Sequence, residues 1–359
     1  MNPVFAYVGC RTTRARNGRG TGIGIGVYQI EESTQTWREV EIFGPLDNPS
    51  FLVLNTRQDT LYCVHGDGTE VSSYRIDAIT GRLTLLNRRS CEGRNPVHLA
   101  LSRDGATLHV ANYATGSLAA LEIEADGALG ALWRDTRLAG EPGPHRIEQT
   151  ASHPHQIPRY LTPRDDTDWH IVPDKGLDTV FAVQWPAGSH ETRVVGQRTR
   201  EGSGPRHAAF HPSLSLVYVV NELDSTVVTF RFDIVSGVLE PLHTVSVIPP
   251  AYQAMTRAAG IAIHPNGRAL YVSNRGHDSI ATLTLDDASG LPGQVQWRDC
   301  GGQCPRFIGL GPEATHLYVT NELTDSIVQF ALDADSGQPR STGYVLHSAS
   351  PVCIVFKTH

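Results

Sequence analysis

Residues 204–222 read Gly-Pro-Arg-His-Ala-Ala-Phe-His-Pro-Ser-Leu-Ser-Leu-Val-Tyr-Val-Val-Asn-Glu, and this stretch decides the fold. It contains an apolar strand, a turn around Pro212 and a second apolar strand, which is the pattern of a β-hairpin. Arg206 and His207 stand at the start of the first strand, and Glu222 follows the second. Because antiparallel strands joined by a short turn return to the side where they began, these three residues should emerge on one edge.

The same hairpin plan recurs along the chain. Five further pairs of apolar segments lie at residues 48–54 with 61–65, 95–101 with 108–112, 153–156 with 169–172, 258–263 with 270–274, and 304–310 with 317–321. Each of the six pairs precedes a third, alternating strand, at Val71–Ile76, Ser117–Ile123, Thr179–Gln184, Thr226–Phe232, Ser279–Leu285 and Ser326–Leu332. Many units continue through a Gly-containing turn into a more polar fourth strand. Four short strands repeated every ~45–60 residues are the signature of a β-propeller blade.

The two ends of the chain supply a seventh blade. Residues 5–9, 24–30 and 37–41 match the second, third and fourth strands of a blade, and residues 351–356 match a first strand. A C-terminal inner strand that joins N-terminal strands would close the ring by main-chain hydrogen bonds and leave no open edge. The sequence therefore predicts an all-β, seven-bladed β-propeller that forms a single domain over residues 1–359.

Charge and composition exclude several classes of partner. The net charge of −7 and the pI near 6.1 argue against a nucleic-acid or membrane-surface partner, so an anionic substrate would need locally concentrated positive charge. Six scattered cysteines are too few for a disulfide framework in a chain of this length. The chain has neither a signal-like N-terminal segment nor an apolar run long enough to span a membrane, and we expect a cytoplasmic protein of undetermined oligomeric state.

Two positions in each blade should gather polar residues around one mouth of the central channel. These are the start of the first strand and the end of the second, which lie on the same face of the disc. The first position carries His98, His153, His155, Arg206, His207 and Arg306. The second carries Arg11, Asp67, Tyr113, Lys175, Glu222, Arg275 and Glu322. Arg and His with a few carboxylates, beside strands of Leu, Val, Ile and Ala, indicate an anion-binding pocket that contains an acid/base group.

Structural roles remain open for part of this set. Glu322 repeats Glu222, and Arg306 repeats Arg206, so each motif could belong to the scaffold of the blade. His153 and His155 could both ligate zinc, but no third ligand stands at an obvious spacing, and we expect neither a metal nor a cofactor. The third unit departs most from the repeat, with a long segment at 140–150 and an irregular insert at 163–168, and polar irregular loops often carry function.

The chain resembles the seven-bladed propeller lactonases, a family that includes one type of 6-phosphogluconolactonase and the fungal 3-carboxy-cis,cis-muconate cyclases. The resemblance covers nearly the whole chain. Its best-matching segments are Gly-Pro-Arg-His-Ala-Ala-Phe-His-Pro at 204–212, Val-Asn-Glu-Leu-Asp-Ser-Thr-Val at 220–227, Leu-Tyr-Val-Ser-Asn-Arg at 270–275, Pro-Arg-Phe at 305–307 and Pro-Asp-Lys-Gly-Leu-Asp at 173–178.

The resemblance implies a catalytic set as well as a fold. The site proposed for the cyclase branch is a His, two Arg and a Glu, which fall here on His155, Arg206, Arg275 and Glu222. The widened third unit and the Arg-rich first loop, with Arg11, Arg14, Arg16 and Arg19, depart from the family pattern and affect which substrate fits.

Our first hypothesis is a metal-independent lactone hydrolase for a small anionic sugar lactone such as 6-phosphogluconolactone. Arg206 and Arg275 would bind the anion and the oxyanion, and Glu222 or His155 would act as the general base. His207 would position that base, and further substrate contacts are expected from His153, Lys175, Arg306 and His98. The alternatives are a carboxy-cis,cis-muconate cycloisomerase that uses the same residues, and a non-catalytic propeller that binds a protein partner.

Overall fold

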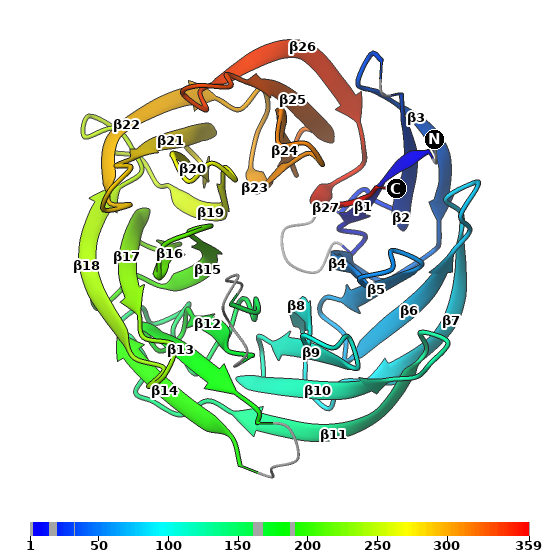
Figure 1. The fold of residues 1–359 in the computed structure, drawn as a ribbon, viewed down its shortest axis with the longest axis horizontal. Helices are drawn as coiled ribbons and strands as arrows, with labels where there is room; N and C mark the ends of the chain where they lie inside the picture. The colour runs from blue at the N-terminus through cyan, green and yellow to red at the C-terminus, as the bar shows by residue number, and fades with distance from the viewer. Residues whose placement is uncertain (1–2, 14–19, 32, 161–167, 187–190, 359) are drawn as a thin grey trace.

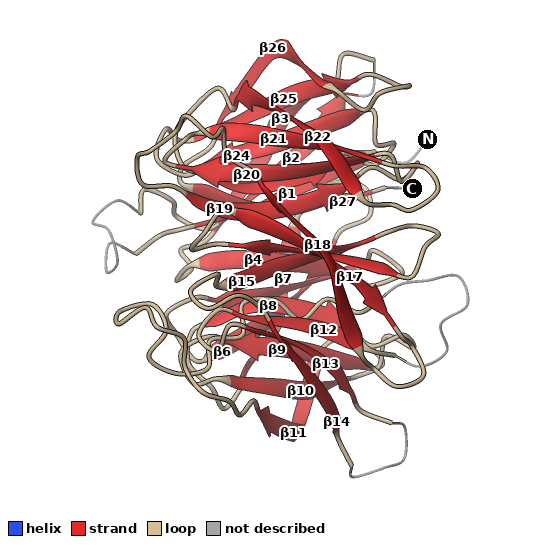
Figure 2. Cartoon of the chain, turned by 90° about the vertical axis from the view of Figure 1, so that its left-hand side faces the viewer, coloured by secondary structure: helices blue, strands red, loops and turns tan. Residues whose placement is uncertain are grey.

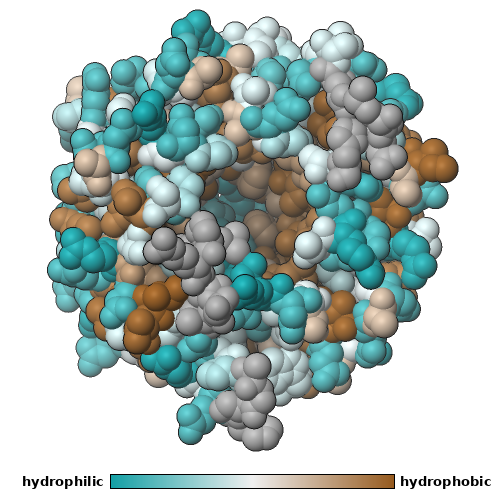
Figure 3. Space-filling model, in the orientation of Figure 1, coloured by the Kyte–Doolittle hydropathy of each residue, from teal (hydrophilic) through white to brown (hydrophobic). Residues whose placement is uncertain are grey.

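The computed structural model describes residues 3–13, 20–31, 33–160, 168–186 and 191–358. Within these ranges the chain forms 27 strands and no helix, and the strands make seven antiparallel sheets around a central channel (Figure 1). In the view from the edge, the strands cross the disc obliquely and the loops gather on its two faces (Figure 2). One face is visibly hollowed at its centre (Figure 3). The all-β propeller expected from the repeat is confirmed.

The blades follow one another in chain order around the ring. From the inner strand outward, three of them are β4 (Pro49–Leu54), β5 (Thr60–His65), β6 (Glu70–Ile76) and β7 (Leu83–Ser90); β8 (Pro96–Leu101), β9 (Thr107–Asn112), β10 (Ser117–Ile123) and β11 (Leu129–Arg137); and β12 (His170–Asp174), β13 (Thr179–Gln184) and β14 (Arg193–Arg198). The next three are β15 (Pro205–Phe210), β16 (Leu216–Asn221), β17 (Thr226–Phe232) and β18 (Leu239–Ser246); β19 (Arg257–Ile263), β20 (Ala269–Arg275), β21 (Ser279–Leu285) and β22 (Pro292–Asp299); and β23 (Pro305–Leu310), β24 (His316–Asn321), β25 (Ser326–Leu332) and β26 (Pro339–His347).

Both ends of the chain share the seventh blade, as the sequence predicts. The strand β27 (Pro351–Lys357) pairs antiparallel with β1 (Val4–Cys10), and β2 (Ile25–Glu31) and β3 (Thr36–Phe43) complete the sheet. Figure 1 shows the two termini beside each other. This pairing provides the hydrogen bonds that an open edge would lack.

Apolar side chains fill the spaces between neighbouring blades, because each sheet is covered on both faces. Every residue of β5, β13 and β16 is buried, whereas in the outer strand β18 only Leu239 is buried and most of the other residues are exposed. A tyrosine on several second strands also donates a hydrogen bond to a glycine carbonyl in the turn of the next blade: Tyr7 to Gly81 (2.9 Å), Tyr218 to Gly290 (2.6 Å) and Tyr271 to Gly337 (2.6 Å). These contacts link each of these blades to the next one in the ring.

A β-bulge at the start of the inner strands directs side chains into the channel. In β15 the register shifts between Pro205 and His207, and equivalent shifts occur in β4, β8 and β23. A bulge leaves one residue outside the regular alternation and re-aims its side chain. The bulged residues Ser50, Val97, Arg206 and Arg306 all line cavities in the channel.

The third repeat unit differs from the predicted plan. The segment expected as its first strand, residues 153–156, makes only an isolated bridge between Pro154 and Asp174, so the described part of this blade has three strands. The physical reason is that Pro158 and Pro173, whose carbonyls accept hydrogen bonds between these two segments, have no N–H to donate in return. Of the predicted insert at 163–168, only Asp168 lies within the described residues.

Candidate active site

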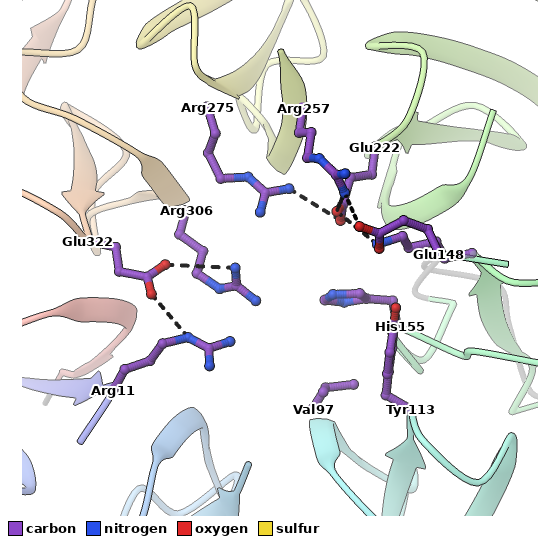
Figure 4. Close-up of a pocket in the computed structure, with 11 residues that line it drawn as sticks. Arg11, Val97, Tyr113, Glu148, His155, Glu222, Arg257, Arg275, Arg306 and Glu322 are labelled. Carbon is purple, nitrogen blue, oxygen red and sulfur yellow. Dashed lines mark hydrogen bonds and ion pairs between the residues drawn. The ribbon is translucent and has the colours of Figure 1, made fainter. Parts of the chain in front are cut away.

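A polar cavity of about 420 Å³ lies at the face where the inner strands begin. It is lined by Arg11, Val97, Tyr113, Glu148, His155, Lys175, Glu222, Arg257, Arg275, Arg306 and Glu322 (Figure 4). A smaller cavity of about 30 Å³ shares four of these residues and is lined in addition by Arg206 and His207. The hairpin argument correctly brings Arg206 and Glu222 to one edge, since Pro205 pairs with Asn221.

Glu222 is the centre of one wall of the cavity. Its Oε1 lies 2.9 Å from Lys175 Nζ and 3.4 Å from Arg257 Nη1. Its Oε2 lies 3.0 Å from Arg206 Nε and 3.2 Å from Arg275 Nη2. The carboxylate therefore contacts four cations, although only 5 % of its side chain is exposed.

The surrounding cations decide the protonation state of Glu222. Burial alone would raise the pKa of its carboxyl, but Arg275, Lys175 and Arg206 outweigh burial and hold the pKa well below its ordinary value. Burial would likewise lower the pKa of Lys175, yet Glu222 raises it above the ordinary value. Glu222 is thus a firmly ionised carboxylate, and both of its oxygens are already engaged by cations.

Two of the arginines on this wall are also fixed by backbone carbonyls. Arg206 Nη1 donates to the Ala259 carbonyl at 2.6 Å and lies 3.2 Å from His207 Nε2. Arg275 Nη2 donates to the Ala258 carbonyl at 3.2 Å. Arg206 Nη1 and Arg275 Nη2 are therefore engaged within the protein.

The opposite wall repeats this arrangement with fewer partners. Glu322 Oε1 lies 3.2 Å from Arg11 Nε, and its Oε2 lies 3.7 Å from Arg306 Nη1. Within the described part of the chain, the Glu322 contact is the only ion pair of Arg306, and its guanidinium makes no hydrogen bond. Arg306 therefore keeps N–H donors for a ligand.

His155 projects between the two walls (Figure 4). Its backbone N–H donates to the Pro173 carbonyl at 3.0 Å, and its ring packs edge-on to the ring of His207. Its buried Nδ1 has no hydrogen-bond partner among the described residues. Burial, together with the nearby Arg206 cation, holds the pKa of His155 well below its ordinary value, so the imidazole is neutral at pH 7.

The other predicted histidines lie differently. His98 does not line either cavity: its ring packs on Phe51, with ring centroids 4.0 Å apart, and its Nδ1 accepts from the Ile157 N–H at 3.3 Å. Val97, which directly follows the proline, takes the channel-facing bulge position instead. His153 stacks on the Tyr113 ring, and its Nδ1 lies 2.8 Å from the Tyr113 carbonyl oxygen.

Two charged residues of the cavity were not predicted, Arg257 and Glu148. Arg257 stands one residue before the segment predicted as a first strand, and it pairs with Arg275, so its place in the blade corresponds to Gly204 and not to Arg206. Glu148 belongs to the irregular segment 140–150, which has no counterpart in the repeat and therefore no register from which to place it. Of the Arg-rich first loop, Arg11 lines the cavity, and Arg14, Arg16 and Arg19 lie outside the described residues.

A closed seven-bladed propeller with a polar cavity at one mouth of its channel defines a scaffold that binds a small ligand among its loops. Residues 5–356 match the family described as Lactonase, 7-bladed beta-propeller, and the chain belongs to this family of lactonases.

Individual relatives agree with this assignment. The chain is 28 % identical over 308 residues to 6-phosphogluconolactonase of Bacillus subtilis, which covers 85 % of this chain and 84 % of the relative. The structure of a periplasmic gluconolactonase from Pseudomonas aeruginosa superposes with a TM-score of 0.88 at 28 % identity and 99 % coverage of both chains. A putative 6-phosphogluconolactonase from Bacteroides fragilis gives a TM-score of 0.87 at 26 % identity, with coverage of 99 % of this chain and 98 % of the other.

Proposed function

We propose that the protein hydrolyses 6-phosphogluconolactone, without a metal ion, in the cavity around His155. The observation that carries the proposal is that the neutral, buried imidazole of His155 faces Arg306, whose guanidinium has N–H groups available for a ligand. The cavity lining, with Arg306 included, carries five cations and three carboxylates, an excess of two positive charges. That excess matches a phosphate group, which carries about −1.5 to −2 at pH 7. The Bacillus subtilis relative bears the name of this activity.

In the proposed reaction, His155 accepts a proton from water as the water oxygen attacks the lactone carbonyl carbon. Arg306 donates to the oxyanion that forms on the carbonyl oxygen, a contact that strengthens as the negative charge develops. The bond between the carbonyl carbon and the ring oxygen then breaks, and the protonated His155 returns its proton to that oxygen. The product is an open-chain hydroxy acid, which ionises to a carboxylate.

The geometry favours different roles for the other predicted catalytic residues. Both oxygens of Glu222 are engaged by cations, whereas Nδ1 of His155 has no partner among the described residues, so we assign Glu222 the role of holding Lys175, Arg206 and Arg275 in place. Arg206 in turn lies beside His207, whose ring packs against His155. We propose that these residues position the base and the cations.

The test is a substrate panel with purified protein: 6-phosphogluconolactone, unphosphorylated gluconolactone and a carboxy-cis,cis-muconate. We expect the highest kcat/KM with the phosphorylated lactone, and a loss of most of that activity in Arg306→Gln. Consumption of the muconate, followed by its ultraviolet absorbance, without lactone hydrolysis would refute the proposal in favour of a cycloisomerase.

We also propose that the protein is cytoplasmic. All six cysteines are free thiols, five of them buried, which is common in a reducing compartment. Among the described residues, no helix has the length and apolar character needed to cross a membrane. Cell fractionation tests the location, and recovery in the periplasm, where the Pseudomonas aeruginosa relative is placed by its name, would contradict it.

A further inference from the structure

Glu148 bridges two cations at the rim of the cavity. Its Oε2 lies 2.6 Å from Lys175 Nζ, and its Oε1 lies 2.7 Å from Arg257 Nη1. Burial would raise the pKa of Glu148, but Lys175 and Arg257 outweigh burial and lower it, so the side chain is a carboxylate. The carboxylate of Glu148 thus occupies a position at which two cations, Lys175 and Arg257, contact one anion.

The two cations do not depend on Glu148 for their positions. Lys175 and Arg257 also contact Glu222 Oε1, at 2.9 Å and 3.4 Å, and Lys175 lies over the Tyr113 ring. Glu222 directly follows the buried strand β16, and 5 % of its side chain is exposed. Glu148 comes instead from an irregular segment, and 24 % of its side chain is exposed. Glu148 can therefore leave while Glu222 keeps the pair of cations in place.

We propose that Lys175 and Arg257 form an anion subsite at the cavity rim, which Glu148 occupies in the free protein and which the phosphate of the ligand takes over. This inference rests on the proposed function, because it places the phosphate of a phosphorylated lactone. A phosphate oxygen can accept from both cations in the same charge-assisted way as the carboxylate. The subsite lies across the cavity from Arg306 (Figure 4), so the lactone carbonyl can approach Arg306 while the phosphate binds at the rim.

Glu148 then affects the binding of ligands with phosphate and of ligands without phosphate differently. The phosphate must displace an internal anion before it binds, which weakens the binding of free phosphate. A ligand that lacks phosphate does not displace Glu148, so the affinity of that ligand does not depend on Glu148.

The experiment measures the dissociation constant of inorganic phosphate by isothermal titration calorimetry. Glu148→Gln keeps the size of the side chain and removes its charge, and we expect phosphate to bind about tenfold more tightly, a change equivalent to about 1.4 kcal/mol. The matched control is Glu141→Gln, which removes one charge from the same segment at a side chain that is 91 % exposed. We expect the control to bind phosphate within twofold of the unaltered protein.

Two further measurements locate the effect. Adding Arg257→Gln to Glu148→Gln should abolish the gain in phosphate affinity, and thermal unfolding in the presence and absence of phosphate should rank the variants in the same order. The KM for 6-phosphogluconolactone should fall in Glu148→Gln, and the KM for unphosphorylated gluconolactone should stay unchanged.

Equal phosphate affinity in Glu148→Gln and Glu141→Gln would overturn the subsite, as would tight binding that survives the loss of Arg257. If phosphate binds more tightly to Glu148→Gln but no lactone is hydrolysed by the unaltered protein, the proposed function fails and the subsite stands. If lactone is hydrolysed and phosphate affinity does not respond to Glu148→Gln, the subsite fails and the proposed function stands.

Discussion

Replacement of Glu222 by Gln should reduce the stability of the protein more than any other single charge removal in the cavity. The substitution keeps the shape of the side chain but leaves four cations within 3.4 Å without their shared anion. Removing one partner from a buried ion pair costs about 3–5 kcal/mol. Unfolding entropy of about 2.1 cal/mol/K per residue gives about 0.75 kcal/mol/K for 359 residues, so the unfolding midpoint should fall by about 4–7 °C.

Glu322→Gln is the matched control, because Glu322 occupies the same position in another blade. Among the described residues, Glu322 contacts two cations, at 3.2 and 3.7 Å, so we expect about half the loss, or about 2–3 °C. Scanning calorimetry of both variants at pH 7 provides the comparison. Equal midpoints for the two variants, or a Glu222→Gln midpoint equal to that of the unaltered protein, would refute the view that Glu222 organises the cations.

Three further predictions concern the proposed base, the oxyanion donor and the buried histidines. His155→Asn should lower kcat about 10²–10⁴-fold with little change in unfolding temperature, and steady-state kinetics that retain kcat would contradict its role as base. Arg306→Gln should lower kcat about 10²–10³-fold, whereas a rise in KM alone would indicate simple binding. Burial lowers the pKa of His98 and of His109 to about 3, so the unfolded state takes up protons first as the pH falls below about 6.5. Stability is therefore complete above pH 6.5 and declines towards pH 3, by about 2 kcal/mol per histidine at pH 5. Urea titrations across this range should show a shallower decline for His109→Phe, which can keep the stacking of this ring on Trp185, and an unchanged decline would contradict the assignment.

The fold could be predicted from the sequence because the information is repeated. A single hairpin such as residues 204–222 fits many all-β folds, but six copies and the split seventh blade fit only a closed ring. The one failure of the strand pattern, at residues 153–156, occurs where Pro158 and Pro173 lack the main-chain N–H groups that would complete the ladder. The pattern shows where apolar segments recur, and it does not show whether each segment can complete a ladder.

The cavity could be predicted only as far as the strand register extends. Arg206, Glu222, Arg275 and Lys175 were found because they begin or end strands whose direction follows from the repeat. His98 does not line the cavity because a bulge after Pro96 directs the side chain of Val97 into the channel instead. The sequence carries no direct signal of such a bulge. Glu148 was missed because it lies in a segment outside the repeat.

The ion pairs of Glu222 could not be predicted from the sequence either. The position of Glu222 in the repeat places an acidic residue near the channel. Such a residue could act either as a general base or as an ion-pair partner that holds cations in place. The distances from the Glu222 carboxylate to four cations favour the role of ion-pair partner, and His155 remains the proposed base. That distinction depends on side-chain geometry from several blades, which no local pattern encodes.

The measurement that tests the central claim most directly is the initial rate of 6-phosphogluconolactone hydrolysis by the purified protein in the presence of EDTA. The spontaneous rate in buffer and the rate with His155→Asn are measured beside it. The account predicts saturable hydrolysis well above the spontaneous rate, unaffected by EDTA and nearly lost in His155→Asn. A rate equal to that of buffer, or one that requires an added divalent cation, would contradict it.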